Sequence, residues 1–253
     1  TIEINPDWII NAAAYTQVDN AEKEKDLAFL INSQSPKAIA EGLMSSKGKM
    51  IQISTDYVFN GSKNIAYKPH DSRDPLQVYG KSKALGEKAV ETLLFPLNKA
   101  KILRTSWIMS PFGNNFALTM LKLHNNLDTI KVIDDQFGCL TSAFTLATTC
   151  WQIIKKDLQH QKIQDILHCC DKGTTNWYEI ACKIGEFGKK IGIIDKPANV
   201  QAVKSIDWNS AAKRPAYSVL DVDISFRDLE QKQIGWGKSL ESILKEIKSC
   251  QSI

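Results

Sequence analysis

Short apolar runs alternate with longer segments of helical period along this chain, and that alternation constrains the fold more than any other feature. It is typical of a parallel sheet wrapped by helices, because parallel strands need long crossover connections. The runs expected to form buried strands are 8–10, 50–53, 101–103 and 166–168. The segments expected to form helices around them are 19–30, 36–44, 78–94, 115–123 and 144–155. The predicted class is α/β.

The spacing of these elements loosens after about residue 105. Loops at 110–114 and 171–175 interrupt the chain there, and two further helices are expected at 177–191 and 238–247. We therefore expect a smaller, mixed lobe after the main sheet.

Composition excludes several classes of protein. The 253 residues carry a net charge of only +4 and no basic block of the kind that follows a nucleic-acid backbone. No apolar run reaches the roughly 20 residues that a membrane span requires. The 6 cysteines lack the paired spacing of metal ligands, and the first residues do not resemble a signal peptide. We expect a soluble, cytoplasmic protein with reduced thiols.

Tyr79 and Lys83 form the first candidate catalytic pair. They open the predicted helix 78–94 four residues apart, so their side chains project from one face. A phenol has a pKa of about 10, and an ammonium one helical turn away is expected to lower it. Tyr79 is thus a candidate general acid or base. Alone the pair is weak, because the same spacing occurs on ordinary solvated helices.

Polar side chains end the second predicted strand, at Thr55 and Asp56. Open α/β sheets bind ligands at the carboxyl ends of their strands. The Thr55 hydroxyl can hydrogen-bond a reacting carbonyl oxygen, and Asp56 can hold a sugar hydroxyl or support proton transfer. The alternative is that both residues cap a turn.

Three alanines, 12–14, follow the first predicted strand. Their small side chains let a flat cofactor approach the backbone, although core packing explains them almost as well.

Taken in order, these motifs resemble the extended short-chain dehydrogenases. Additional segments narrow the resemblance to the dTDP-4-dehydrorhamnose reductase family, and it extends over essentially the whole chain. The three first motifs are 11–14, 54–59 and 79–83, and the additional ones are 104–107, 113–116, 135–138, 175–179 and 214–215.

The resemblance implies a Rossmann-like doubly wound parallel sheet with a smaller substrate-binding lobe. It also implies NADPH- or NADH-dependent reduction of the 4-keto group of dTDP-4-dehydro-L-rhamnose to dTDP-L-rhamnose, a step of polysaccharide biosynthesis. Tyr79 would donate a proton to the new alkoxide. Lys83 would lower the pKa of Tyr79 and hold the nicotinamide ribose. Thr55 would tune the hydrogen bond to the carbonyl.

Further contacts are implied in the same way. Asp56 and Trp107 would contact the sugar, while Asn115 and Arg214 are candidates for nucleotide and diphosphate contacts. The stretch that matches the family's cofactor-lining segment is Ala13, Ala14, Tyr15 and Thr16.

Residues 1–108 are then predicted to be the remainder of a dinucleotide-binding domain that carries the catalytic residues. Residues 109–253 are predicted to be largely a sugar-nucleotide-binding lobe, interleaved with returning Rossmann elements. The expected partner is a dTDP-sugar, with no nucleic acid and no membrane, and a homodimer is left open. Relatives that dimerise with Mg²⁺ suggest a metal, but no compact carboxylate cluster here identifies a site for one.

One departure from the family concerns the cofactor. Members open with a strand and a Gly-rich turn that holds the diphosphate, and this sequence begins roughly 50 residues too late for that turn. A later Gly-x-Gly at 235–237 follows no predicted strand and is expected to be a loop. We expect a fragment of a longer chain, or else a truncated product with doubtful activity and weak dinucleotide affinity.

Two other functions stay open from the sequence. One is a nucleotide-sugar epimerase or dehydratase that shares the fold and the Tyr/Lys pair. The other is a non-catalytic subunit like the regulatory subunit of methionine adenosyltransferase. The segments at Trp107 and at 135–136 speak against the first, and Trp107, Thr175 and Trp177 speak against the second.

Overall fold

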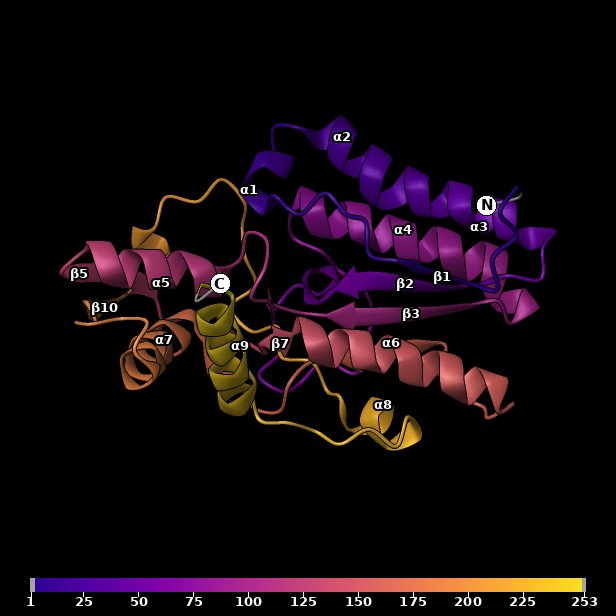
Figure 1. Ribbon diagram of the computed structural model, residues 1–253. Helices are drawn as coiled ribbons and strands as arrows, with labels where there is room; N and C mark the ends of the chain where they lie inside the picture. The colour runs from indigo at the N-terminus through magenta and orange to yellow at the C-terminus, as the bar shows by residue number, and fades with distance from the viewer. Residues whose placement is uncertain (1–2, 252–253) are drawn as a thin grey trace. The chain divides into compact units, whose positions relative to one another are not determined.

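The computed structural model describes residues 3–251, which form two compact units (Figure 1). The first unit contains the chain up to Thr105 together with 148–169 and 210–231. The second contains 106–147, 170–209 and the chain from Lys232 onward. The first unit therefore recruits two segments from the second half of the sequence.

A four-stranded parallel sheet, in the order β1-β2-β3-β8, forms the centre of the first unit. Its strands are β1 (Trp8–Asn11), β2 (Lys49–Thr55), β3 (Ala100–Thr105) and β8 (Ile166–Cys169). All four predicted strands and the α/β class are confirmed. β2 is buried from Met50 to Thr55, as expected of an inner parallel strand. β1 lies at the edge of the described sheet, where Ile10 is 39% exposed.

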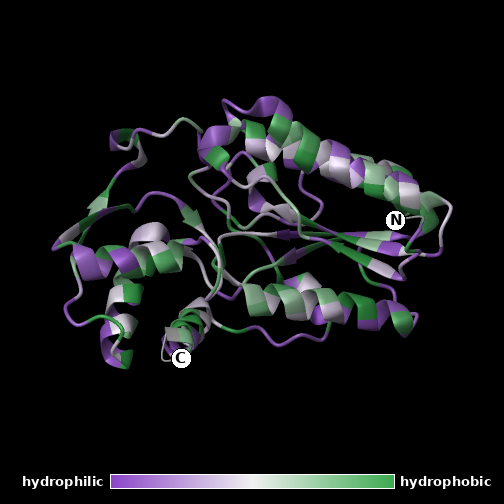
Figure 2. Ribbon diagram, turned by 45° about the horizontal axis from the view of Figure 1, so that its top comes forward, coloured by the Kyte–Doolittle hydropathy of each residue, from purple (hydrophilic) through white to green (hydrophobic). Residues whose placement is uncertain are grey.

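Helices cover both faces of this sheet (Figures 1 and 2). α3 and α4 pack along one face, and the part of α6 that belongs to this unit lies on the other. Figure 2 shows hydrophobic and hydrophilic residues interleaved along these helices, as amphipathic packing requires. The helical elements of the unit are α1 (Val18–Ala21), α2 (Lys25–Phe29), η1 (Leu30–Gln34), α3 (Ser35–Met44), η2 (Asp56–Val58), α4 (Val78–Leu94), η3 (Phe95–Leu97), α6 (Ala143–Leu158) and α8 (Asp223–Asp228).

The single helix expected at 19–30 is wrong, because the chain there forms α1, a turn, α2 and a π-helix, η1. Two carboxylates in this segment face other parts of the fold. Glu22 accepts a hydrogen bond from the backbone of Val78, and Glu24 accepts one from the Tyr15 hydroxyl. These tertiary contacts override the helical period of the sequence.

The π-helix η1 brings Asn32 against α4. Asn32 is buried, and its amide pairs with the backbone of Tyr15 and donates to the Ser82 hydroxyl at 3.0 Å. Gly86 permits this approach, since a Cβ there would lie 2.1 Å from the Asn32 carbonyl oxygen. The stretch predicted to line the cofactor and the helix of Tyr79 are therefore joined through one side chain.

A buried ion network ties α4 to the sheet. The carboxylate of Glu87, 0% exposed, accepts two hydrogen bonds from the guanidinium of Arg104 on β3, which is 1% exposed. Arg73 also donates to Glu87 and to Glu91. A third Arg104 nitrogen reaches the Pro69 carbonyl, so every charge in the centre of the network is compensated.

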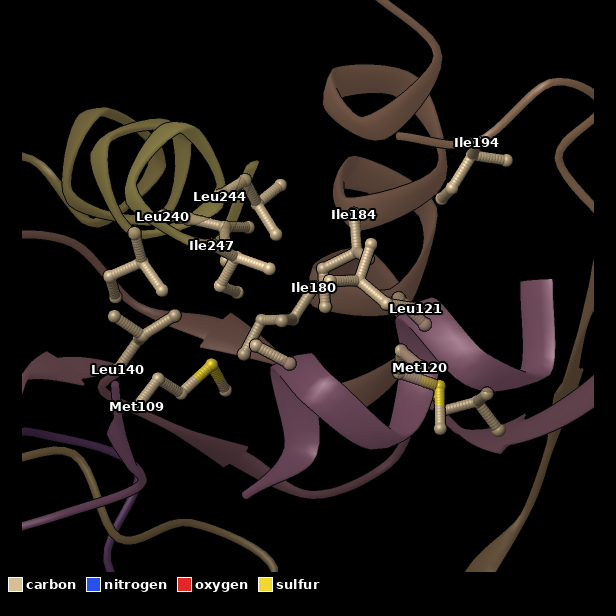
Figure 3. Packing of buried hydrophobic residues seen from close by; sticks show 14 of the residues in the cluster. Met109, Met120, Leu121, Leu140, Ile180, Ile184, Ile194, Leu240, Leu244 and Ile247 are labelled. Carbon is tan, nitrogen blue, oxygen red and sulfur yellow. The ribbon is translucent and has the colours of Figure 1, made fainter. Parts of the chain in front are cut away.

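The second unit has a core of its own, formed where α5, α7 and α9 meet (Figure 3). Its helical elements are α5 (Phe116–Asn126), α7 (Trp177–Ile191), η4 (Ser205–Asp207) and α9 (Trp236–Gln251). Its strands form three pairs, β5 (Thr129–Ile133) with β10 (Asn199–Val203), β4 (Ile108–Met109) with β7 (Thr141–Ser142), and β6 (Phe137–Gly138) with β9 (Thr175–Asn176). Figure 3 shows Ile180 and Ile184 of α7 pointing toward Leu244 and Ile247 of α9.

The loop expected at 235–237 is wrong in part, because α9 already begins at Trp236. Gly235 itself pairs with Lys172 in an isolated β-bridge, which leads directly into the helix. No helix among residues 3–251 is long and apolar enough to cross a membrane.

Candidate active site

Tyr79 and Thr55 meet at the carboxyl end of β2. Tyr79 lies in the first turn of α4, and Thr55 is the last residue of β2. A hydrogen bond with Thr55 lowers the pKa of Tyr79, but burial outweighs it and raises that pKa to about 12. The phenol therefore stays protonated at neutral pH.

Lys83 lies one turn further along α4, as predicted, and only 4% of it is exposed. Its ammonium donates a hydrogen bond of 2.7 Å to the Ile53 carbonyl oxygen. Burial lowers the pKa of Lys83 to about 8, against a smaller opposing effect of Glu87. The expected lowering of the Tyr79 pKa by Lys83 is not found, because burial of the phenol dominates and Lys83 faces the strand backbone.

Asp56 follows Thr55 and is only 2% exposed. Its carboxyl group accepts hydrogen bonds from the hydroxyls of Ser218, at 2.6 Å, and Thr55, at 3.0 Å. Burial raises the pKa of Asp56 to about 7, while these two hydrogen bonds oppose the shift. In this conformation Asp56 holds Thr55 in place and links β2 to the segment 210–231.

The stretch Ala13–Thr16 leaves the carboxyl end of β1 as a loop. Ala13 and Thr16 are exposed, Ala14 is half-buried and Tyr15 is buried. Ala13, Ala14 and Thr16 thus offer backbone that a flat ligand can approach, while Tyr15 packs inward beside Ala21, Ala28 and Val78.

Arg214 lies in the returning segment of the first unit, where its guanidinium binds the Asp19 carboxylate at 2.6 Å. It also forms a hydrogen bond with the Tyr57 hydroxyl. The Tyr57 ring in turn packs edge-on against the Tyr79 ring, with centroids 6.1 Å apart. Arg214 therefore belongs to the surroundings of Tyr79.

Two predicted substrate contacts lie in the second unit, Trp107 and Asn115. Trp107 has a left-handed backbone with φ 45° and stacks on Trp177 at 4.0 Å. Gly138 makes room for its ring, since a Cβ there would lie 2.6 Å from it. The Trp107 indole nitrogen is buried and has no hydrogen-bond partner among the described residues, as expected of a donor kept for a ligand.

Asn115 has a local structural role. Its side chain caps α5 by accepting a hydrogen bond from the Leu118 N–H, and it donates to the carbonyls of Ser110 and Phe112. These bonds occupy the amide in the structure described.

Sequence reasoning did not select Asn32, Ser218 or Glu22, all of which contact the candidate site through α4 or Asp56. Ser218 and Glu22 are ordinary surface residues by sequence pattern, and only the fold gives them partners. Asn32 left a usable signal, since an asparagine inside an apolar helical segment is unfavourable unless it has a partner. Among residues 3–251, no group of three His, Cys, Asp or Glu side chains is placed to hold a metal ion.

Comparison with known proteins decides the family. Residues 1–249 match the family described as the RmlD substrate binding domain. A dTDP-4-dehydrorhamnose reductase of Salmonella typhimurium is 36% identical over 251 residues, which are 99% of this chain and 83% of the relative. The chain belongs to the dTDP-4-dehydrorhamnose reductase family.

Solved structures of dTDP-4-dehydrorhamnose reductases agree. One from Bacillus anthracis, in complex with NADP, is 35% identical with a TM-score of 0.85 and covers 96% of this chain and 82% of that one. Another from Clostridium acetobutylicum is 34% identical with a TM-score of 0.86, over 97% and 82% of the two chains. The predicted family and the Rossmann-like fold are confirmed.

Proposed function

We propose that this protein reduces the 4-keto group of dTDP-4-dehydro-L-rhamnose to dTDP-L-rhamnose, with NADPH as the reductant and Tyr79 as the proton donor. The observation that carries the proposal is the Tyr79 phenol, hydrogen-bonded to Thr55 and protonated at neutral pH. Reduction of a ketone needs a proton at the new alkoxide, which such a phenol can supply. The names of the relatives and the NADP complex of one of them support the substrate and the cofactor.

The residues present fit a nicotinamide cofactor. The buried Lys83 ammonium has one hydrogen bond, to Ile53, so its remaining protons can bind the hydroxyls of a ribose. Exposed Ala13 and Thr16 allow a flat group to approach the loop after β1. When bound, the cofactor supplies the hydride.

The chain's own groups act on the oxygen. Tyr79 can donate to the carbonyl oxygen, whose negative charge grows during reduction, and Thr55 can do so by turning its one hydroxyl proton from Asp56 to that oxygen. Tyr79 then transfers its proton to the alkoxide. The Lys83 cation lies one turn away and faces the Ile53 carbonyl, so its part in the reaction is to hold the cofactor's ribose.

We further propose that Trp107 binds the sugar through its unpartnered indole N–H and its face, and that Asn115 and Arg214 contact the nucleotide and the diphosphate. Asn115 would exchange its present partners for the ligand, whereas Arg214 would keep Asp19 and offer its remaining N–H groups to the diphosphate. Asp56 then holds Thr55, in addition to the sugar contact first expected of it. By this proposal the second unit is the sugar-nucleotide lobe.

The six free thiols suit a cytoplasmic enzyme. The proposal is compatible with either a monomer or a homodimer, and a mass measurement in solution would distinguish them.

The test is NADPH oxidation in the presence of dTDP-4-dehydro-L-rhamnose, with the product identified by NMR. The proposal expects dTDP-L-rhamnose formed in equal amount to the NADPH consumed. An epimerase would change the sugar without net oxidation of NADPH, and a regulatory subunit would consume none. Either result would remove the proposed function.

A further inference from the structure

The short turn before α2 contacts the helix of Tyr79 from outside. Glu22, the residue that follows α1 and begins this turn, accepts a hydrogen bond of 2.8 Å from the backbone N–H of Val78. Val78 is the first residue of α4, and Tyr79 is the second. The helix's own N-cap residue, Gln77, makes no side-chain cap hydrogen bond. The cap is therefore supplied by a residue 56 positions away in the sequence.

A carboxylate suits this position for two reasons. The first N–H groups of a helix have no partner within the helix, so each needs an acceptor from elsewhere. The N-terminal end of the helix dipole also favours negative charge. Gln77 does not supply this cap, since both of its buried amide atoms are without a hydrogen-bond partner in the described part of the chain.

The turn is anchored through α1, in which Asp19 lies three residues before Glu22. The Asp19 carboxylate accepts hydrogen bonds from the Ser210 hydroxyl at 2.9 Å and from the Ala212 backbone at 3.0 Å, and it pairs with Arg214. Asp19 thereby fixes α1 to the returning segment of the first unit. Because α1 is fixed and contacts α4, Glu22, which follows α1, is held close to the start of α4.

The same anchor reaches Tyr79 by a second route. Arg214, held by Asp19, forms a hydrogen bond with Tyr57, and the Tyr57 ring packs edge-on against that of Tyr79. One acidic turn thus constrains both the backbone and the ring of the proposed proton donor.

We propose that Glu22 is a positioning residue for Tyr79, which it aligns by capping the first turn of α4 from the turn anchored by Asp19. The inference rests on the proposed function, because it assumes that Tyr79 is the proton donor. Glu22 touches neither the phenol nor Lys83 in the structure, so it acts through the backbone of α4. Loss of the cap lets the first turn of α4 move. Proton transfer then slows, because its rate depends on placing the Tyr79 hydroxyl within a fraction of an ångström.

The test compares Glu22→Ala, which removes the acceptor, with Glu22→Gln, which keeps an oxygen at the same reach. Asp26→Ala is the matched control, since Asp26 is a nearby exposed carboxylate of α2 for whose side chain the described structure shows no hydrogen bond or ion pair. The expected result is a kcat for Glu22→Ala at least about tenfold below wild type, with KM for the dTDP-sugar changed less than about threefold. Glu22→Gln should recover most of kcat, and Asp26→Ala should match wild type.

Residue-resolved hydrogen exchange provides a readout that does not depend on activity. Exchange at the Val78 amide should be about tenfold faster in Glu22→Ala than in wild type, and close to wild type in Glu22→Gln. A wild-type kcat in Glu22→Ala, or a Glu22→Gln variant as impaired as Glu22→Ala, would overturn the inference. If the wild-type protein reduces no dTDP-sugar, the proposed function fails, while the exchange rates still show whether Glu22 caps α4.

Discussion

At the scale of single residues, burial sets the protonation states that the chemistry needs. Tyr79 is held protonated by burial, and Lys83 is brought by burial to a pKa of about 8. A phenol that is protonated at neutral pH can donate that proton to an alkoxide, and a charged Lys83 can hold the cofactor's ribose.

The first prediction concerns the pH dependence of that pair. The lowered pKa of Lys83 means that its charge is present below about pH 8 and is lost as pH rises through that value. We therefore expect kcat/KM to fall above about pH 8, since this ratio reports groups of the free protein. A pH profile between 6 and 10 tests this, and a flat profile through pH 9 would contradict it.

Lys83→Met provides the complementary variant. It removes the charge while keeping the length of the side chain, so we expect the alkaline limb of the profile to disappear together with at least ~100-fold of kcat/KM. The measurement is the same profile, repeated with the variant. A variant that keeps the alkaline limb would assign it to another group.

At the scale of elements, α4 organises the first unit, and the buried ion network holds it to the sheet. Replacing Arg104 with Ala would leave the buried carboxylate of Glu87 with Arg73 as its remaining partner. We expect a loss of about 3–5 kcal/mol in the free energy of unfolding, as for other broken buried pairs. Urea denaturation measures it.

The matched control for this prediction is Lys101→Ala on the same strand. Lys101 pairs with Asp165, which is about half exposed, so its loss should cost no more than about 1 kcal/mol. Equal losses in the two variants would show that the buried Arg104 network contributes no more to the free energy of unfolding than a half-exposed ion pair.

Elements with a complete local pattern could be predicted from the sequence at both ends. α4 and α7 begin and end at the predicted residues, and α7 carries its own signals in the Asn176 cap and the left-handed Gly192. The helix expected at 19–30 failed because its carboxylates bind distant partners. β5 was missed although its residues alternate between exposed and buried, a pattern that was visible in the sequence.

The site was predictable to the same extent. Spacing and motif order identified Tyr79, Lys83 and Thr55, and the structure brings them together at the end of β2. The direction in which the pKa of Tyr79 is shifted could not be predicted from the sequence, because the burial of its side chain depends on the packing of the whole unit. The Glu22 cap of α4 could not be predicted either, since Glu22 and Val78 are distant along the chain and only the fold brings them together.

At the scale of the whole molecule, buried titratable groups make stability depend on pH. Burial lowers the pKa of His168 to about 3, whereas an unfolded chain binds this proton below about pH 6.5. The unfolded state therefore gains protons first as pH falls, and stability decreases. From pH 6.5 to pH 5 the loss due to His168 is about 2 kcal/mol.

Asp56 affects the pH dependence of stability with the opposite sign, because its raised pKa of about 7 lets the folded state bind a proton first as pH falls.

Comparison of wild type with His168→Gln isolates the contribution of the histidine. We expect the stability of wild type to fall relative to that of the variant by about 2 kcal/mol between pH 6.5 and pH 5. Denaturation at the two pH values measures this difference, and parallel changes in both proteins would refute it.

The most direct measurement of the central claim is the turnover of Tyr79→Phe with dTDP-4-dehydro-L-rhamnose and NADPH, alongside wild type. The variant keeps the ring that packs on Tyr57 and loses only the donated proton. We predict an NADPH affinity close to wild type and a kcat lower by at least ~100-fold. A Tyr79→Phe variant that forms dTDP-L-rhamnose at the wild-type rate would contradict the assignment of Tyr79 as the proton donor.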